Sequence, residues 1–162
     1  MDKIPTTPKE CDQRPPHTST PGVFHALVND RPFLTTRVSA VSCLRAELKG
    51  PCEHPIWKIH AVGKVCYRRT IIGFFIDDSL QPGTYDLVAN EGLTAVYHLT
   101  PKQLAQVYHS RDFESGSVRL LECNAQTGRI RGHFEFAIPA VGFRVSEGMF
   151  DLVCQREHPP RS

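Results

Sequence analysis

The sequence lacks the two kinds of segment that would place the chain in a membrane or export it. It has no run of about eighteen apolar residues, which excludes a helix that spans a bilayer. The first residues, MDKIPTTPKECDQRPP, contain no apolar core of a secretory signal. We therefore expect a cytoplasmic protein from the chain as given, and a periplasmic or envelope protein if a leader has been removed.

The sequence also lacks the short motifs of common enzyme classes. It has no G-x-S-x-G nucleophile turn, no Walker A loop, no G-x-G-x-x-G and no H-E-x-x-H. His133 and Glu135, with Arg131 beside them, have the spacing of an acid–base pair, but charged residues on any exposed strand have it too. We expect no enzyme, no catalytic residue and no cofactor. A hydrolase would need a cleft around a titratable group with a shifted pKa.

The sequence has no large excess of positive or of negative charge. The 19 Lys and Arg residues nearly balance the 17 Asp and Glu residues, for a formal net charge of +2. The tight basic pairs are Arg68-Arg69 and Arg129/Arg131, which fall short of the basic stripe of a nucleic-acid reader. We therefore expect no nucleic acid as a partner.

The six cysteines, at positions 11, 43, 52, 66, 123 and 154, include no C-x-x-C pair. Cys52-x-His54, followed by His60, is the most metal-like cluster, but a zinc site usually takes four ligands and there is no second knuckle. We expect no metal. Cys123 and Cys154 are predicted to lie on the first and third of three adjacent strands between residues 116 and 154. The two cysteines would then be about 10 Å apart, too far for a disulfide. Free, partly buried thiols are therefore expected, and disulfides are the alternative that an even number suggests.

The clearest pattern lies between Gly116 and Cys154 and predicts three successive antiparallel strands. Residues 129–138 alternate between apolar and polar side chains, the period of a half-buried strand. The apolar set is Ile130, Phe134, Phe136 and Ile138, and the polar set is Arg129, Arg131, His133 and Glu135. A change of phase in the third strand predicts a β-bulge at Ser146–Gly148.

The remaining chain predicts further strands between two unstructured ends. Five prolines predict a flexible tether over residues 1–21, and QREHPPRS predicts a disordered tail over 155–162, so the β domain spans 22–154. One hairpin is expected to turn at 29–32 and a second at Gly63-Lys64, followed by a strand over 93–99. Residues 49–55 are expected to form a loop, and Thr100, Pro101 and Gln103 predict one short helix that ends near Val107.

Four segments carry a resemblance to a known group: FHALVNDRPFLTTRVSA, GTYDL, SGSVRLLECNAQTGRIRGHFEFAIP and VSEGMFDL. They follow F-x-A-x-V-N-G-x-x-F near the start, G-T-Y midway, and G-x-F-x-F and V-x-x-G-x-F towards the end. This pattern resembles an uncharacterised group of small all-β domains found in bacterial envelope lipoproteins. The resemblance spans most of 22–154 and implies a β-sandwich or flattened barrel behind a proline-rich tether, but no activity. Asp30 stands where the group has a turn glycine.

These observations predict an all-β protein, an antiparallel β-sandwich or incomplete β-barrel of about eight to ten strands with one short helix. The expected function is a non-catalytic module that binds another protein, as an accessory or immunity-type factor does. Its expected binding surface is the exposed sheet face with Arg129, Arg131, His133 and Glu135. The alternative is a carrier that holds an apolar small molecule among Phe74, Phe134, Phe136 and Phe150.

Overall fold

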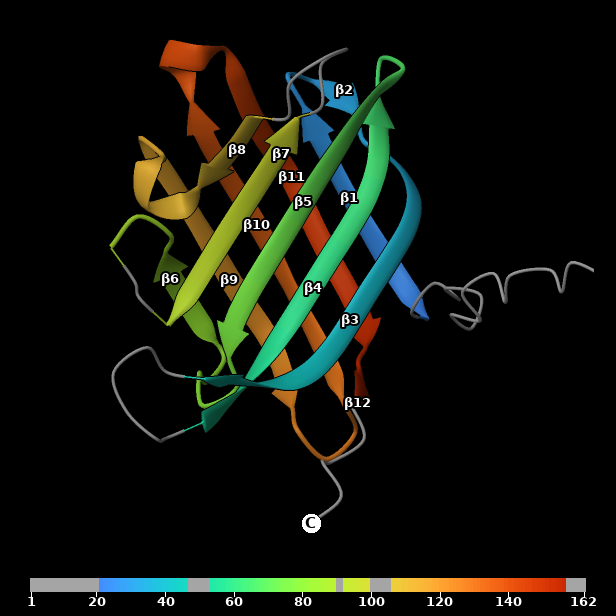
Figure 1. Ribbon diagram of the computed structural model, residues 1–162, viewed down its shortest axis with the longest axis vertical. Coiled ribbons are helices and arrows are strands. Elements are labelled where there is room, and N and C mark those ends of the chain that lie inside the picture. The colour runs from blue at the N-terminus through green and yellow to red at the C-terminus, as the bar shows by residue number, and fades with distance from the viewer. Residues whose placement is uncertain (1–20, 47–52, 90–91, 100–105, 157–162) are drawn as a thin grey trace, which may run out of the picture.

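The structure is a computed structural model that describes residues 21–46, 53–89, 92–99 and 106–156. These residues form two six-stranded sheets packed face to face (Figure 1). Sheet A has the strand order β2-β1-β11-β10-β9-β6, and sheet B has the order β12-β3-β4-β5-β7-β8. Both orders are open, so the predicted all-β fold is confirmed as a sandwich.

In sheet A the strands are β1 (Gly22–Val28), β2 (Arg31–Pro32), β6 (Gly83–Asp86), β9 (Ser115–Asn124), β10 (Arg129–Ile138) and β11 (Phe143–Val153). In sheet B they are β3 (Leu34–Ala46), β4 (Glu53–Val65), β5 (Arg68–Asp77), β7 (Leu93–Leu99), β8 (Gln106–His109) and β12 (Gln155–Arg156). Two short 3-10 turns, η1 (Ser110–Asp112) and η2 (Pro139–Val141), connect strands that are consecutive in the chain: η1 joins β8 to β9, and η2 joins β10 to β11. All paired strands are antiparallel except β12, which runs parallel to β3.

The predicted unit of three C-terminal strands is confirmed as β9, β10 and β11. The bulge is confirmed too: Phe134 pairs with Gly148 and Phe136 with Val145, so β11 carries one extra residue. Glu147 in that bulge has a φ of 49°. Gly148 lies against the Phe134 ring so closely that a Cβ atom there would overlap it. The bulge thus lets the apolar side chains on both sides of it face the core.

The first hairpin turns as predicted, but the second was placed wrongly. Asn29 and Asp30 form the turn between β1 and β2, both with positive φ. The β4–β5 turn lies at Cys66-Tyr67, not at Gly63-Lys64, because Val65 pairs with Arg68. Gly63 lies inside β4, where a Cβ atom would come within 2.7 Å of the Phe33 ring. This glycine therefore serves close packing and does not mark a turn.

The β4–β5 turn holds two residues in an unfavourable backbone conformation. Cys66 and Tyr67 have φ values of 48° and 68°, which suit the Asn-Gly pair of a two-residue hairpin far better. We expect the double substitution Cys66→Asn/Tyr67→Gly to raise the free energy of unfolding by about 1–2 kcal/mol. Denaturant unfolding of this variant and of the unaltered protein measures the difference. Equal midpoints would show that the turn stores no strain.

Three further predictions need correction. The helix expected to reach Val107 does not, because Gln106 and Val107 belong to β8 and pair with Leu99 and His98 of β7; residues 100–105 lie outside the described part. The loop expected over 49–55 ends earlier, since β4 begins at Glu53. The segment predicted as a tail contributes β12, which pairs with β3 at Val41 and Ser42. The predicted tether, residues 1–20, lies outside the described residues.

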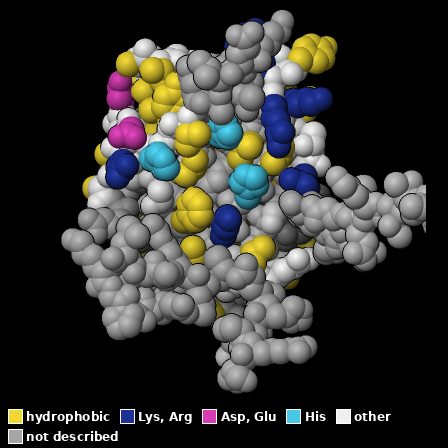
Figure 2. Space-filling view, in the orientation of Figure 1, with side chains coloured by type: hydrophobic (Ala, Val, Ile, Leu, Met, Phe, Trp, Pro, Cys, Tyr) yellow, Lys and Arg dark blue, Asp and Glu magenta, His cyan; other side chains and the backbone are white. Residues whose placement is uncertain are grey.

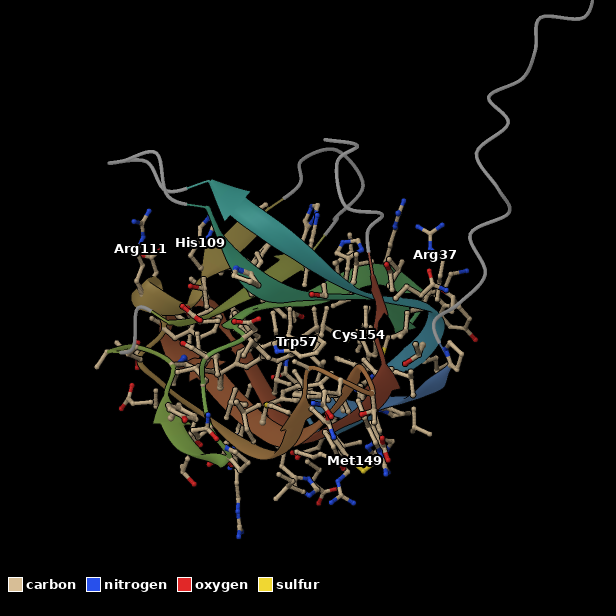
Figure 3. The ribbon with its side chains drawn as sticks, turned by 90° about the horizontal axis from the view of Figure 1, so that it is seen from below. Arg37, Trp57, His109, Arg111, Met149 and Cys154 are labelled. Atoms are coloured by element: carbon tan, nitrogen blue, oxygen red, sulfur yellow. The ribbon has the colours of Figure 1, made fainter. Side chains whose placement is uncertain are left out.

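Aromatic rings fill the space between the sheets. The Phe134 ring lies 4.8 Å from Phe74, 5.4 Å from Phe24, 6.1 Å from Phe150 and 6.2 Å from Phe136, measured between ring centroids. The four phenylalanines of the carrier hypothesis are at most 3% exposed. They come from both sheets and contact one another, which is the arrangement of an ordinary core. Trp57 also lies between the sheets, together with Cys154 (Figure 3).

Candidate functional site

The four residues predicted to form the binding surface lie on the outer face of sheet A, along β10. His133 and Glu135 are exposed, while Arg129 and Arg131 are half-buried. Met149, which pairs with His133, lies on this outer side as well (Figure 3). The structure therefore places the predicted residues on one face, as the alternation required.

Arg129 and Arg131 are paired with carboxylates of neighbouring strands. Arg129 donates two hydrogen bonds to Asp151 of β11, Nε to Oδ1 at 3.1 Å and a terminal nitrogen to Oδ2 at 2.9 Å. Glu122 of β9 lies 3.6 Å from Arg129 and 3.9 Å from Arg131. The hydrogen bond from Arg129 lowers the pKa of Asp151 below its ordinary value. This is cross-strand charge pairing within the sheet, so these arginines hold little charge in reserve for a partner.

Glu135 borders an open groove at one end of sheet A. The groove has a volume of about 760 Å³, and Asp86, Glu114, Ser117 and Arg144 line it with Glu135. Its carboxylates come from β6, from the segment after η1 and from β10. His133 does not line it, so His133 and Glu135 do not face a common cleft.

The outer face of sheet B has a different composition, and sequence reasoning missed it. Its outward side chains include seven cationic or histidine residues, which we call the basic face: Arg37, Lys58, His60, Lys64, Arg69, His98 and His109. Figure 2 shows this side of the molecule, with histidines at its centre, basic residues around them and the visible acidic residues confined to one edge. Arg37 and His109 project outward from the sheet (Figure 3).

The strand register explains how these residues come together. His60 of β4 pairs with Gly73 of β5, Gly73 pairs with Val96 of β7, and Val96 pairs with His109 of β8. In the adjacent row Arg37 pairs with Val62, Val62 with Ile71, and Ile71 with His98. Alternation along β4 turns Trp57, Ile59 and Ala61 inward, which turns Lys58, His60, Val62 and Lys64 outward.

The basic residues of this face have no acidic partners within the described part of the chain. None of Arg37, Lys58, Lys64 and Arg69 forms an ion pair there. Asp77, at the far end of β5, accepts hydrogen bonds from the backbone and hydroxyl of Ser79. Among the described residues, therefore, no acidic side chain offsets the positive charge of these four residues.

The neighbours of His60 make its protonation unfavourable. Partial burial lowers the pKa of His60, and the positive charges of Lys58, Arg37, Arg69 and His98 lower it further. Nε2 of His98 is buried and has no hydrogen-bond partner among the described residues. The lowered pKa of His60 thus reflects its burial and a concentration of positive charge on this surface.

Apolar side chains separate the charges of the basic face. Val62 is buried, Ile71, Phe75 and Val96 are half-buried, and Val107 is 48% exposed. Gly73 lies among them without a side chain, and β5 keeps a continuous register with β4 and β7 there. The basic face is thus a mixed apolar and cationic surface.

The cysteines described with side chains, Cys66, Cys123 and Cys154, are free thiols. Burial raises the pKa of Cys123 to about 11 and that of Cys154 to about 12. Both are therefore protonated at neutral pH and poor nucleophiles. Within the described ranges no three His, Cys, Asp or Glu side chains form a group that could hold a metal ion, and Cys52 of the metal-like cluster lies outside them.

Comparisons with family models, with curated proteins and with solved structures find no match to this chain. The resemblance to envelope lipoprotein domains thus stays a prediction. Among the described residues, no helix has the length and apolar character needed to cross a membrane.

Proposed function

We propose that this domain is a non-catalytic module that binds an acidic surface of another protein through the basic face of sheet B. The observation that carries the proposal is a set of cations without acidic partners in the described chain, whereas Arg129 and Arg131 on the opposite sheet are paired with carboxylates. Complementary charge would steer the partner and fix its orientation.

The apolar residues of the basic face favour a protein over a nucleic acid. Phosphate backbones are bound by closely spaced Lys and Arg side chains along a stripe. Here Ile71, Phe75, Val96 and Val107 stand among the cations, and their burial would stabilise a complex only if the partner offers apolar groups as well. Acidic protein surfaces combine both kinds of group.

Amide chemical shifts measured by NMR test which face binds. The partner is first captured with the full chain, identified and purified, and then added to the ¹⁵N-labelled protein. We expect the largest shift changes at Lys58 and His60 of β4 and at His98 of β7. Changes centred on Arg131 and His133 of β10 would contradict the proposed face, and saturable binding of a nucleic acid alone would contradict the proposed class of partner.

A further inference from the structure

A small pocket lies at one end of the basic face, where strands β3, β4 and β5 meet. Its volume is about 340 Å³, and its lining residues are Thr36, Arg37, Val62, Gly63, Lys64 and Arg69. The register of β3 shifts between Thr35 and Arg37 relative to β4, so the chain bulges at Thr36. The Thr36 hydroxyl donates a hydrogen bond to the carbonyl oxygen of Val62 at 3.0 Å, which holds the bulge in place.

Three cations from three strands converge on this pocket. Lys64 and Arg69 are cross-strand partners in the β4–β5 hairpin, and Arg37 approaches from β3 beside them. Like charges placed directly across a sheet repel each other. None of the three has an acidic partner among the described residues, so the pocket concentrates positive charge that no described carboxylate offsets.

This arrangement fits an anion with more than one charge. A carboxylate offers one negative charge and two oxygens, whereas a phosphomonoester carries about −1.5 to −2 at neutral pH and three acceptor oxygens. Two guanidinium groups and one ammonium group can each donate to a separate oxygen of such a group. Val62 and Gly63 add no charge or side-chain polar group.

We propose that the pocket formed by Arg37, Lys64 and Arg69 binds a phosphoryl dianion. The group can belong to a phosphorylated side chain of the partner or to a small phosphate ester, because the pocket would recognise the shared phosphoryl chemistry. The site deepens the proposed function, and it is tested with small anions that need no protein partner. Loss of partner binding and loss of phosphate binding are therefore separate results.

The test is a set of NMR titrations of the ¹⁵N-labelled chain at pH 7.5 and constant low ionic strength. Inorganic phosphate, phosphoserine with both ends capped, and acetate are the probes. We expect saturable shifts at residues 36–37, 63–64 and 69 with both phosphate probes, and at least tenfold weaker binding of acetate. Tighter binding of capped phosphoserine than of inorganic phosphate would identify a phosphorylated side chain as the source of the bound phosphoryl group. Equal binding of the two probes would identify a small phosphate as the source.

Two matched variants locate the effect. Lys64→Gln removes a charge from the pocket, and Lys58→Gln removes the same charge from the same strand of the basic face outside the pocket. We expect Lys64→Gln to weaken phosphate binding about tenfold and Lys58→Gln to change it less than twofold. Equal weakening by the two variants, or shifts that never saturate, would overturn the proposal in favour of diffuse attraction to the face.

Discussion

Replacing Phe134 with alanine is expected to lower the free energy of unfolding by about 3–5 kcal/mol, the largest effect of any single substitution considered for this domain. The ring lies in the middle of the sandwich, with four other phenylalanine rings within 6.2 Å between centroids, and it is 3% exposed. Its removal costs the transfer free energy of the side chain and leaves a cavity that rigid sheets on both sides cannot close. Urea unfolding followed by circular dichroism measures the loss.

Two further variants make this measurement decisive. Phe75→Ala removes the same side chain from the outer face of sheet B, where the ring is half-buried, and is expected to cost less than half as much. Phe134→Leu keeps most of the volume and gives a folded protein to measure if the alanine variant does not fold. If Phe134→Ala lowered the free energy of unfolding by less than about 1 kcal/mol, the ring would border an internal cavity, as the ligand-carrier alternative requires.

The double substitution Arg37→Glu/Lys58→Glu is expected to weaken binding of the acidic partner protein about 100-fold. Both side chains belong to the basic face, and neither has an acidic partner in the described part of the chain. The substitution removes two attractions and introduces two like-charge contacts with the partner. Most of the loss should appear as slower association, because exposed charges act mainly on the encounter. Surface plasmon resonance with the purified partner measures both rates.

A charge-matched control lies on the other sheet. Arg119→Glu/Arg144→Glu makes the same change in net charge on exposed residues of β9 and β11. We expect that variant to bind within about threefold of the unaltered protein, since it lies outside the basic face. Binding of the unaltered protein should also fall as ionic strength rises past the point where the screening length is about 8 Å. If the control loses as much affinity, net charge and not the basic face governs the interaction.

The strands that sequence reasoning located correctly are those with a clear period of two. Residues 129–138 and 93–99 were predicted to the residue, because an alternating side-chain pattern can satisfy both core and solvent only as a strand. The turn at Cys66-Tyr67 was missed because neither residue favours positive φ, and the nearby Gly63 offered a more conventional turn. There the register of the paired strands overrode the local preference.

For the candidate site too, the sequence could show some features and not others. The alternation that turns Arg131 and His133 to the outer face could be seen in the sequence, and so could the alternation of Lys58, His60 and Lys64 with Trp57, Ile59 and Ala61. The sequence could not show that Asp151, 22 residues from Arg129, would pair with it. Charges cancel or accumulate according to which strands are neighbours, and local pattern does not contain that information.

The sequence by itself determined that the chain forms strands and which side chains enter the core, because both follow from the two-residue repeat of an extended backbone and the transfer of apolar groups from water. Only the tertiary structure decided that Arg37, Lys64 and Arg69 lie around one pocket, and that Arg129 and Arg131 of sheet A lie beside the carboxylates of Glu122 and Asp151. The physical reason is that electrostatic interactions depend on distance in space, and in a sandwich that distance is set by strand order.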